Sequence, residues 1–339
     1  MSIPITVIRG DGIGPEIVDA SLRALEALDA GLEFEFAEAG LAALDAGQEL
    51  IPEETLDLIR KNGTLLKGPL TTPVGGGFRS INVTLRKIFD LYANVRPVLS
   101  IPGTRARFDD VDIITVRENT EGAYLAADAK ISDDGSTAES KMVVTRKGCE
   151  RITRYAFELA RSAGRKKVTI VHKANVLKVV SGLFLDVARE VAARYPDIET
   201  EEMIVDATCM RLVLDPDRFD VIVTTNLFGD IISDLCAGLV GGLGLAPGAN
   251  IGEQAAMFEA VHGSAPDIAG QKIANPCAFM LAGAMMLSHL GMEELAERLR
   301  RAITATVAAG DRVTPDLGGS GSTDSFTDAI IERLQNQSL

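Results

Sequence analysis

Short apolar runs alternate with longer amphipathic stretches along most of this chain. Ile3–Ile8 is rich in apolar residues and predicts a first strand. Beyond a glycine turn, apolar residues recur every three or four positions and predict a helix that ends at Gly31. The alternating segment Leu32–Phe36 predicts a second strand. Because this succession continues to Leu235, the sequence predicts an α/β fold with parallel stretches of sheet.

Three segments depart from that alternation. Gly122–Lys147 has no helical period and carries a polar turn, so it predicts a β-hairpin insertion that serves as an intersubunit arm. Gly241–Gly252 is a glycine-rich corner and is interpreted as a crossing between domains. Cys277–Leu290 is apolar but only about 14 residues long, which predicts a buried helix rather than a membrane span.

The segment Val221–Leu235 carries the first candidate chemistry. Its β-branched start predicts a buried strand, after which Asn226 and Gly229 are expected to turn the chain. Asp230 and Asp234 lie four residues apart, so both carboxylates project from one face of the following helix. Hard oxygen ligands at such a corner suit Mg²⁺ or Mn²⁺. On spacing alone, a capping aspartate beside a solvated one remains the alternative.

The charge of the chain restricts its partners. With 34 basic and 48 acidic residues among 339, the formal net charge is −14, so neither nucleic acid nor an anionic membrane is an expected partner. Between Gly68 and Phe108, however, a single acid accompanies six basic residues, which favours a small polyanion over the alternative of a solvated basic face. The six are Arg79, Arg86, Lys87, Arg96, Arg105 and Arg107.

Cysteine usage and the first residues indicate a compartment. The four cysteines lie far apart and form no C-x-x-C pair, so reduced thiols are expected rather than disulfides or a zinc site. No basic segment precedes an apolar core at the start of the sequence, so no secretory signal is predicted. These features together predict a cytoplasmic protein.

The glycine loops do not match the common nucleotide-binding motifs. Gly10-x-Gly12-x-Gly14 begins like a dinucleotide fingerprint, but position 17 is isoleucine. No G-x-x-x-x-G-K-[ST] loop occurs either. A nucleotide coenzyme would therefore bind outside the Rossmann and P-loop solutions.

A set of longer motifs follows in order along the chain. They are GPLTTPVGGGFRSINVTLRK at 68–87, LYANVRP at 91–97, RENTEGAY at 117–124, HKAN at 172–175, IVD at 204–206, NLFGDIISD at 226–234 and EAVHGSAPDIAG at 259–270. In this order and register, from Ile5 to the C-terminus, the chain resembles the β-decarboxylating dehydrogenases. That family includes isocitrate, isopropylmalate, homoisocitrate and tartrate dehydrogenases.

The resemblance implies an isocitrate/isopropylmalate dehydrogenase-like two-domain α/β fold, not a Rossmann fold, with a central sheet that runs through both domains. It places residues 1–98 and 243–339 in a large domain with both termini and the coenzyme loop. Residues 99–242 would form a small domain with the dimer interface and an arm at about 122–147. Family members are dimers or multiples of dimers with shared active sites. The resemblance therefore implies a homodimer or a multiple of dimers, in which Lys173 and Asp206 would come from the partner subunit.

The family reaction removes a hydride from a 2-hydroxy acid and then releases CO₂ from the β-carboxylate. A divalent cation polarises the hydroxyl and stabilises the enolate, and arginines orient the substrate carboxylates. The resemblance implies metal ligation by Asp206, Asp230 and Asp234, carboxylate binding by Arg86, Arg96 and Arg117, and proton transfer by Lys173 and Tyr124.

Two polar residues favour one substrate within the family. Ser80 and Asn82 match the serine and asparagine that hold the γ-carboxylate in isocitrate dehydrogenases. Against the isopropyl group of isopropylmalate, each would remain unpaired at a cost of about 1–3 kcal/mol. Homoisocitrate adds only a methylene and remains an alternative.

The coenzyme is expected to be NAD. Asp267 and Ile268 stand where NADP-using relatives carry a Lys-Tyr pair for the 2′-phosphate. An aspartate instead accepts a hydrogen bond from the ribose hydroxyl and repels a phosphate. The implied coenzyme contacts are Thr72, Asn82, His262, Gly263, Ser264, Ala265, Pro266, Asp267, Ile268 and Asn275.

The resulting hypothesis is an NAD-dependent isocitrate dehydrogenase of the tricarboxylic acid cycle that uses Mg²⁺ or Mn²⁺. Homoisocitrate dehydrogenase is the nearest alternative. A non-catalytic regulatory subunit is a further one, but the chain keeps all the positions implied in metal, substrate and proton chemistry.

Overall fold

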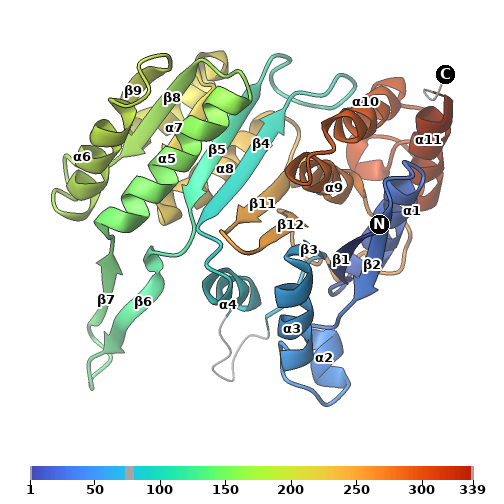
Figure 1. Ribbon diagram of the computed structural model, residues 1–339, viewed down its shortest axis with the longest axis horizontal. Coiled ribbons are helices and arrows are strands. Elements are labelled where there is room, and N and C mark those ends of the chain that lie inside the picture. The colour runs from blue at the N-terminus through green and yellow to red at the C-terminus, as the bar shows by residue number, and fades with distance from the viewer. Residues whose placement is uncertain (1, 73–79, 337–339) are drawn as a thin grey trace.

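One mixed sheet crosses the whole molecule in this computed structural model, which describes residues 2–72 and 80–336 (Figure 1). Its strands are β1 (Ile3–Ile8), β2 (Leu32–Phe36), β3 (Thr64–Lys67), β4 (Ala93–Leu99), β5 (Asp112–Glu118), β8 (Lys167–His172), β9 (Glu199–Ile204), β10 (Val221–Thr224), β11 (Pro247–Ile251) and β12 (Ala256–Ala260). The order across the sheet is β2-β1-β3-β12-β11-β4-β5-β10-β8-β9. β11 is antiparallel to β12 and β4, and β4 is antiparallel to β5, whereas the other neighbours run parallel. Two parallel halves therefore meet at an antiparallel seam.

Helices cover both faces of this sheet. They are α1 (Gly14–Glu26), α2 (Leu41–Asp45), α3 (Glu53–Asn62), α4 (Ile81–Ile88), α5 (Arg146–Ser162), α6 (Val180–Ala192), α7 (Val205–Leu214), α8 (Asn226–Leu239), α9 (Cys277–His289), α10 (Glu293–Ala309) and α11 (Thr323–Asn336). α9 contacts α1, α10, β11 and β12, and this surrounding explains why nearly all of its residues are apolar. The buried helix predicted at Cys277–Leu290 is confirmed.

The hydrophobic core is continuous across the sheet. Its largest cluster joins Ile5 and Leu25 to Phe157 and Val223, which belong to opposite halves of the sheet. The predicted fold, an α/β unit with one sheet through both halves, is confirmed. The domain boundaries at residues 98–99 and 242–243 remain a prediction.

Two predicted boundaries differ from the structure, namely the end of the first helix and the start of the helix in Val221–Leu235. Both predicted strands, Ile3–Ile8 and Leu32–Phe36, are observed as β1 and β2. The first helix ends at Glu26 rather than at Gly31, because Asp29 adopts a positive φ of 53° and turns the chain early. α8 begins at Asn226, so Asn226 and Gly229 belong to its first turn rather than to a preceding turn.

The glycine-rich corner at Gly241–Gly252 is only partly a corner. Residues 241–246 include a short 3-10 turn at Leu243–Leu245, but Pro247–Ile251 form β11 in the middle of the sheet. Small residues are required there because β11 is covered by α9. The second half of the segment predicted as a crossing between domains is therefore a central strand of the sheet.

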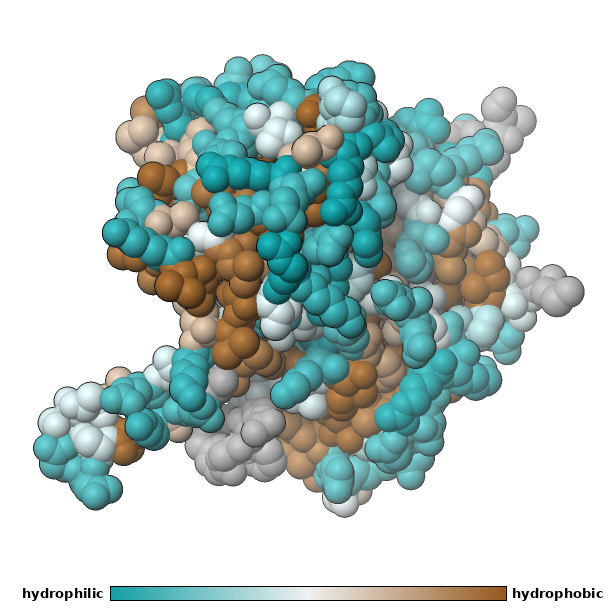
Figure 2. Space-filling view, turned by 60° about the vertical axis from the view of Figure 1, so that its left-hand side comes forward, coloured by the Kyte–Doolittle hydropathy of each residue, from teal (hydrophilic) through white to brown (hydrophobic). Residues whose placement is uncertain are grey.

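A β-hairpin projects from the body, as predicted for Gly122–Lys147. Its strands are β6 (Gly122–Ile131) and β7 (Ala138–Val143), which pair antiparallel as a separate two-stranded sheet. Figures 1 and 2 show that it extends away from the two halves. An isolated hairpin is marginally stable in water, and here β6 contacts α8 of the body. A role of the arm between subunits remains a prediction.

No helix among residues 2–72 and 80–336 combines the length and apolarity needed to cross a bilayer. The four cysteines carry free thiols. Burial raises the pKa of Cys149 and of Cys236 to about 12, so both thiols are unreactive at neutral pH.

A buried polar network lies across the seam. Glu259 of β12 accepts a 2.8 Å contact from Lys67 Nζ and a 3.2 Å contact from Arg86 Nη2. Asn250 Nδ2 donates to the same carboxylate at 2.8 Å. Burial opposes the charge of Glu259, but Lys67 and Arg86 outweigh it and lower its pKa to about 2. The network fixes Arg86, a predicted substrate ligand, to the central sheet.

Removing the charge of Glu259 is expected to destabilise the protein. Glu259→Gln leaves two buried cations without their carboxylate, so the free energy of unfolding at pH 7 should fall by about 3–5 kcal/mol. The folded-state pKa lies below the ordinary value, so this stabilisation is present above about pH 4.5 and declines as the pH falls toward 2. Urea unfolding of both proteins between pH 7 and pH 3 measures it, with the exposed Glu53→Gln as control. A difference that stays constant down to pH 3 would contradict the assignment.

Candidate active site

The predicted substrate and metal residues meet where α4, β4, β5 and α8 converge. Arg96 is in β4 and Arg117 is in β5, and the antiparallel pairing of these strands brings both side chains to α8. Arg86 approaches from α4. On α8, Asp230 and Asp234 lie one turn apart and face the arginines, as their spacing predicts.

Arg117 is almost completely buried, with 1% of its surface exposed. Its Nε and Nη2 donate to Asn226 Oδ1 at 3.1 and 2.7 Å, and its Nη1 pairs with the Asp230 carboxylate. The guanidinium lies over the Tyr124 ring at 5.0 Å. Gly229 permits this close approach, because a Cβ there would lie 2.6 Å from the Cβ and Cγ of Arg117.

Arg96 and Arg86 are also buried but keep unused donors. Arg96 Nη1 donates to Ser233 Oγ at 2.6 Å and to Asp234 Oδ1 at 3.1 Å, and it lies 3.4 Å from Asp230 Oδ1. The Nε atoms of Arg86 and Arg96 are buried, and neither has a hydrogen-bond partner among the residues that the structure describes. Unsatisfied guanidinium donors in one buried region indicate an anionic ligand.

Seven ionisable residues form two ion-paired groups that influence each other electrostatically, and together they are here named the charge cluster. Its cations outnumber its carboxylates by one, which leaves an excess positive charge. The members are Lys67, Arg86, Arg96, Arg117, Asp230, Asp234 and Glu259.

The pKa shifts of the cluster residues reflect their burial and the closeness of their charges. Burial, and next the repulsion from Arg96 and Arg86, lowers the pKa of Arg117 to about 10, so it remains charged at neutral pH. Burial alone would raise the pKa of Asp230, but Arg117 and a hydrogen bond from Tyr124 lower it. Burial and the bond to Asp230 raise the pKa of Tyr124, which therefore stays protonated.

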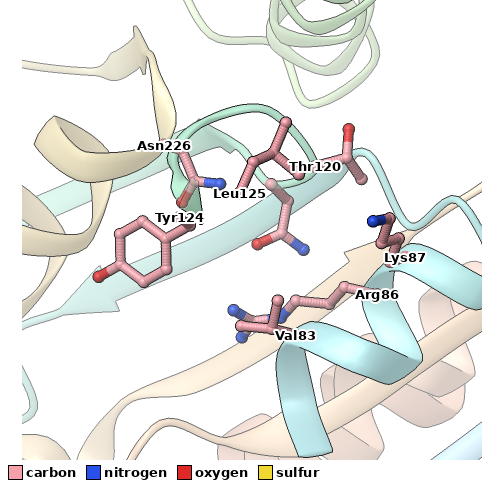
Figure 3. A pocket seen from close by; sticks show the side chains of 8 residues that line it. Val83, Arg86, Lys87, Thr120, Tyr124, Leu125 and Asn226 are labelled. Atoms are coloured by element: carbon pink, nitrogen blue, oxygen red, sulfur yellow. The ribbon is translucent and has the colours of Figure 1, made fainter. Parts of the chain in front are cut away.

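The start of α4 brings Ser80 and Asn82 to the edge of the same region. Ser80 caps the helix and accepts a hydrogen bond from the Val83 amide at 3.5 Å. Asn82 Oδ1 is buried and has no partner within the described ranges. Figure 3 shows Arg86 and Val83 of α4 facing Tyr124 across a small pocket. The pocket thus combines polar groups with an apolar wall.

Lys173 and Asp206 lie apart from this cluster. They form an ion pair with each other, and the Lys173 amide donates to Ser181 Oγ at 2.7 Å. The hydrogen bond from Lys173 lowers the pKa of Asp206. Across residues 2–72 and 80–336, no three His, Cys, Asp or Glu side chains gather closely enough to hold a metal. One chain therefore does not bring the three predicted metal ligands together.

The predicted coenzyme loop follows β12 and packs on the first glycine turn. Ser264 O accepts a hydrogen bond from the Ile13 amide at 2.9 Å, and Ser264 Oγ lies 2.7 Å from Thr71 Oγ1. A Cβ at Gly12 would meet Ser264 O at 2.0 Å. Gly12 thus supports the loop by close backbone contact, whereas Gly10 and Gly14 lie against the backbone of Pro69 and Arg9.

The remaining coenzyme candidates line the same loop. Asp267 is exposed, and its carboxylate binds no other group of the described chain. Burial lowers the pKa of His262, so its ring is neutral at pH 7. Asn275 donates to Asp316 Oδ2 at 2.9 Å and accepts from the Cys277 amide at 2.9 Å.

Thr72 lies at the end of the described range 2–72. Its hydroxyl accepts a hydrogen bond from the Ile81 amide at 3.3 Å. This hydrogen bond joins Thr72, a predicted coenzyme contact, to the start of α4. Arg79 of the predicted basic island lies outside the described residues, and Lys87, Arg105 and Arg107 are exposed.

Sequence reasoning missed four residues of the site. A signal for Asn226 exists, since Asn226, Asp230 and Asp234 share one helix face at four-residue spacing. Ser233 has no such signal. Lys67 and Glu259 are charged residues within otherwise apolar strands, and buried charges of this kind mark a functional region.

Comparison with known proteins gives consistent matches over the whole chain. A family model described as isocitrate/isopropylmalate dehydrogenase matches residues 4–330. Mitochondrial NAD isocitrate dehydrogenase catalytic subunit 5 of Arabidopsis thaliana is 49% identical over 98% of this chain and 88% of its own. A regulatory subunit of the mitochondrial NAD isocitrate dehydrogenase from Dictyostelium discoideum is 48% identical over 97% of this chain and 91% of its own. A 3-isopropylmalate dehydrogenase of Archaeoglobus fulgidus is 49% identical over 97% of this chain and 99% of its own.

Solved structures agree with these matches. The crystal structure of isocitrate dehydrogenase from Methylococcus capsulatus has a TM-score of 0.95 and 56% identity, and the match covers 99% of this chain and 100% of that one. The resemblance drawn from the sequence motifs is confirmed. The curated names differ in substrate and in catalytic or regulatory role at nearly equal identity, so the site itself must decide between them.

The comparisons correct the expected location. The cytoplasmic prediction is wrong, because the NAD isocitrate dehydrogenase relatives are named as mitochondrial proteins. Free thiols report only a reducing environment, and they do not distinguish one reducing compartment from another.

Gly229→Ala is expected to displace Arg117 and to destabilise the protein by about 1–3 kcal/mol, because the new methyl group overlaps the arginine stem. Gly238→Ala is the matched control in the same helix, since no atom lies within 4 Å of its Cβ position. That change should stabilise the protein by up to about 1 kcal/mol. Urea unfolding measures both, and equal effects would disprove the packing argument.

Proposed function

We propose that this chain, which belongs to the isocitrate/isopropylmalate dehydrogenase family, is an NAD-dependent isocitrate dehydrogenase. The reaction oxidises the hydroxyl of isocitrate, transfers a hydride to NAD and releases CO₂, leaving 2-oxoglutarate. The observation that carries this proposal is the charge balance of the buried site. Relatives and a solved structure with isocitrate dehydrogenase names support it.

The charge cluster favours a tricarboxylate over a dicarboxylate. A trianion with one divalent cation carries a single negative charge, which the single excess positive charge of the cluster neutralises. Isopropylmalate is a dianion, and with a divalent cation it would leave that charge unpaired. Asn82, whose buried Oδ1 has no partner in the described chain, adds a polar group that an isopropyl group would not satisfy. Homoisocitrate has the same charge as isocitrate and remains the second candidate.

Asp230 and Asp234, together with the partner subunit's Asp206, are the proposed ligands of Mg²⁺ or Mn²⁺. Carboxylate oxygens suit either cation, and the separation of Asp206 from the other two within one chain is consistent with a shared site. When bound, the cation lowers the pKa of the substrate hydroxyl and withdraws electrons during the loss of CO₂.

The protein residues supply orientation and protons. Arg86, Arg96 and Arg117 orient the substrate carboxylates, and their guanidinium groups are held by Glu259 of β12 and by Ser233 and Asn226 of α8. The Tyr124 phenol remains protonated, so its Oη can deliver a proton to the carbon that loses CO₂. Lys173 of the partner subunit, with its Asp206 beside it, is the proposed group that receives the hydroxyl proton.

NAD is the proposed coenzyme, held by the loop after β12. The free carboxylate of Asp267 can accept hydrogen bonds from the ribose hydroxyls, and its charge repels a 2′-phosphate. His262 and Asn275 are proposed for the adenine side, and Thr72 and Asn82 for the nicotinamide side.

A homodimer, or a multiple of dimers, is the proposed assembly. Met210, Val213 and Leu214 of α7 and Ile231 of α8 are exposed apolar side chains close to the metal aspartates, and Leu214 is 64% exposed. Figure 2 shows hydrophobic surface on the half of the molecule from which the arm projects. A second copy would cover this face, support the arm and contribute Asp206. The proposed division into a large and a small domain places this face in the small one.

A regulatory subunit without activity is less well supported. The arginines, Tyr124 and both aspartates of α8 contact one another as a working site requires. A chain that had lost catalysis would not need this set of buried charges.

Kinetics of the purified chain test the function. With Mg²⁺, kcat/KM is expected to be highest for isocitrate with NAD, at least about tenfold above homoisocitrate and about a hundredfold above isopropylmalate. Activity should disappear with a chelator and return with Mg²⁺. A higher kcat/KM with homoisocitrate than with isocitrate would identify the chain as a homoisocitrate dehydrogenase. Inactivity with every acid would support the regulatory alternative.

The coenzyme assignment predicts a change in preference. Asp267→Lys with Ile268→Tyr exchanges a repulsive carboxylate for a cation, so the ratio of kcat/KM for NADP to that for NAD should rise about tenfold or more. Measuring both coenzymes at saturating isocitrate gives this ratio. Lys272→Ala on the same loop is the control and should leave it unchanged; an unaltered ratio in the double variant would remove Asp267 from the ribose site.

A further inference from the structure

Asn226 joins two parts of the site that are distant in the sequence. It opens α8 and is 3% exposed. Its Oδ1 accepts hydrogen bonds from Nε and Nη2 of Arg117 at 3.1 and 2.7 Å. Its Nδ2 donates to the carbonyl of Glu121 at 3.0 Å. Glu121 lies at the base of the arm, where its carboxylate accepts a hydrogen bond from the Thr145 amide at 2.8 Å.

A local structural role does not account for this side chain. Asn226 is a good residue for the start of a helix, but its side chain bonds no amide of α8, and Thr225 occupies the capping position. Both ends of the Asn226 amide are directed to other segments, β5 and the arm. The side chain therefore connects elements rather than ending a helix.

Asn226 determines which N–H groups of Arg117 remain free for a ligand. A guanidinium has five N–H groups. Asn226 takes two of them and Asp230 takes one, so one N–H remains on each terminal nitrogen. These two N–H groups match the two oxygens of a carboxylate. Without Oδ1, two buried N–H groups would lose their partner, and the guanidinium would turn to satisfy them.

We propose that Asn226 is a positioning residue that fixes the Arg117 guanidinium for one carboxylate of the substrate. This inference rests on the proposed function, in which Arg117 binds the substrate. Asn226 touches neither substrate nor coenzyme in this proposal, and it acts only through Arg117. Through Glu121, the same amide also ties the arginine to the base of the arm.

Steady-state kinetics of Asn226→Ala, Asn226→Asp and Arg117→Ala test the proposal. Asn226→Ala should raise the KM for isocitrate about tenfold and leave the KM for NAD unchanged. Asn226→Asp keeps an acceptor for Arg117, but it loses the donor to Glu121 and its charge offsets the excess positive charge of the charge cluster, so the isocitrate KM should lie between the values of Asn226→Ala and the parent. In the Arg117→Ala background, Asn226→Ala should raise the KM for isocitrate by less than about twofold, because the arginine through which Asn226 acts is already absent.

A distant asparagine provides the matched control. Asn62 lies outside the site, and its amide donates two hydrogen bonds, to Thr6 and Glu35, at 3.0 and 2.9 Å. Asn62→Ala should lower the melting temperature without changing the KM for isocitrate. Should Asn226→Ala not fold, Asn226→Ser replaces it in the same comparison.

The outcomes separate this inference from the function on which it rests. An unchanged isocitrate KM in Asn226→Ala, with a raised one in Arg117→Ala, would overturn the positioning role and leave the function intact. An equal increase with and without Arg117 would also overturn it. An unchanged KM in Arg117→Ala would instead count against the substrate-binding site itself.

Discussion

The burial of several like charges beside a few carboxylates is the constraint on which the site depends. Burial disfavours each guanidinium, and the arginines repel one another, which lowers the pKa values of Arg96 and Arg117. The carboxylates of α8 and β12 offset this repulsion but leave one positive charge over. A buried region of this kind is preorganised to bind an anion, because an anionic ligand neutralises the positive charge that the protein's own carboxylates leave unpaired.

The fold is what makes that charge balance attainable. Lys67, Arg96, Arg117 and Glu259 come from four strands of one sheet, and two helices supply the rest. Backbone hydrogen bonds on both sides of β4 fix the spacing of these strands. Each charge is therefore placed by rigid elements, and small local changes such as a methyl group at residue 229 are transmitted directly to Arg117.

Much of this arrangement is predictable from the sequence, for identifiable reasons. Strands such as Ile3–Ile8 and the paired aspartates of α8 follow from periodicity, which is a local property. The arginines, Tyr124 and the coenzyme loop are located through family motifs. The contacts of Asn226 and Glu259 are not predictable, because they join residues that lie about a hundred or more positions apart in sequence. The strand at Pro247–Ile251 is predicted as a corner, since glycine and proline punctuate loops more often than central strands.

The seam also determines how the two halves can move. Hydrogen-bonded ladders continue without a break from β2 to β9, so sliding one half along the other would disrupt a whole row of backbone bonds. Twisting about β4 and β11 leaves the rows paired. Any adjustment of the halves around a ligand is therefore expected to be a rotation about the middle of the sheet rather than a slide along it.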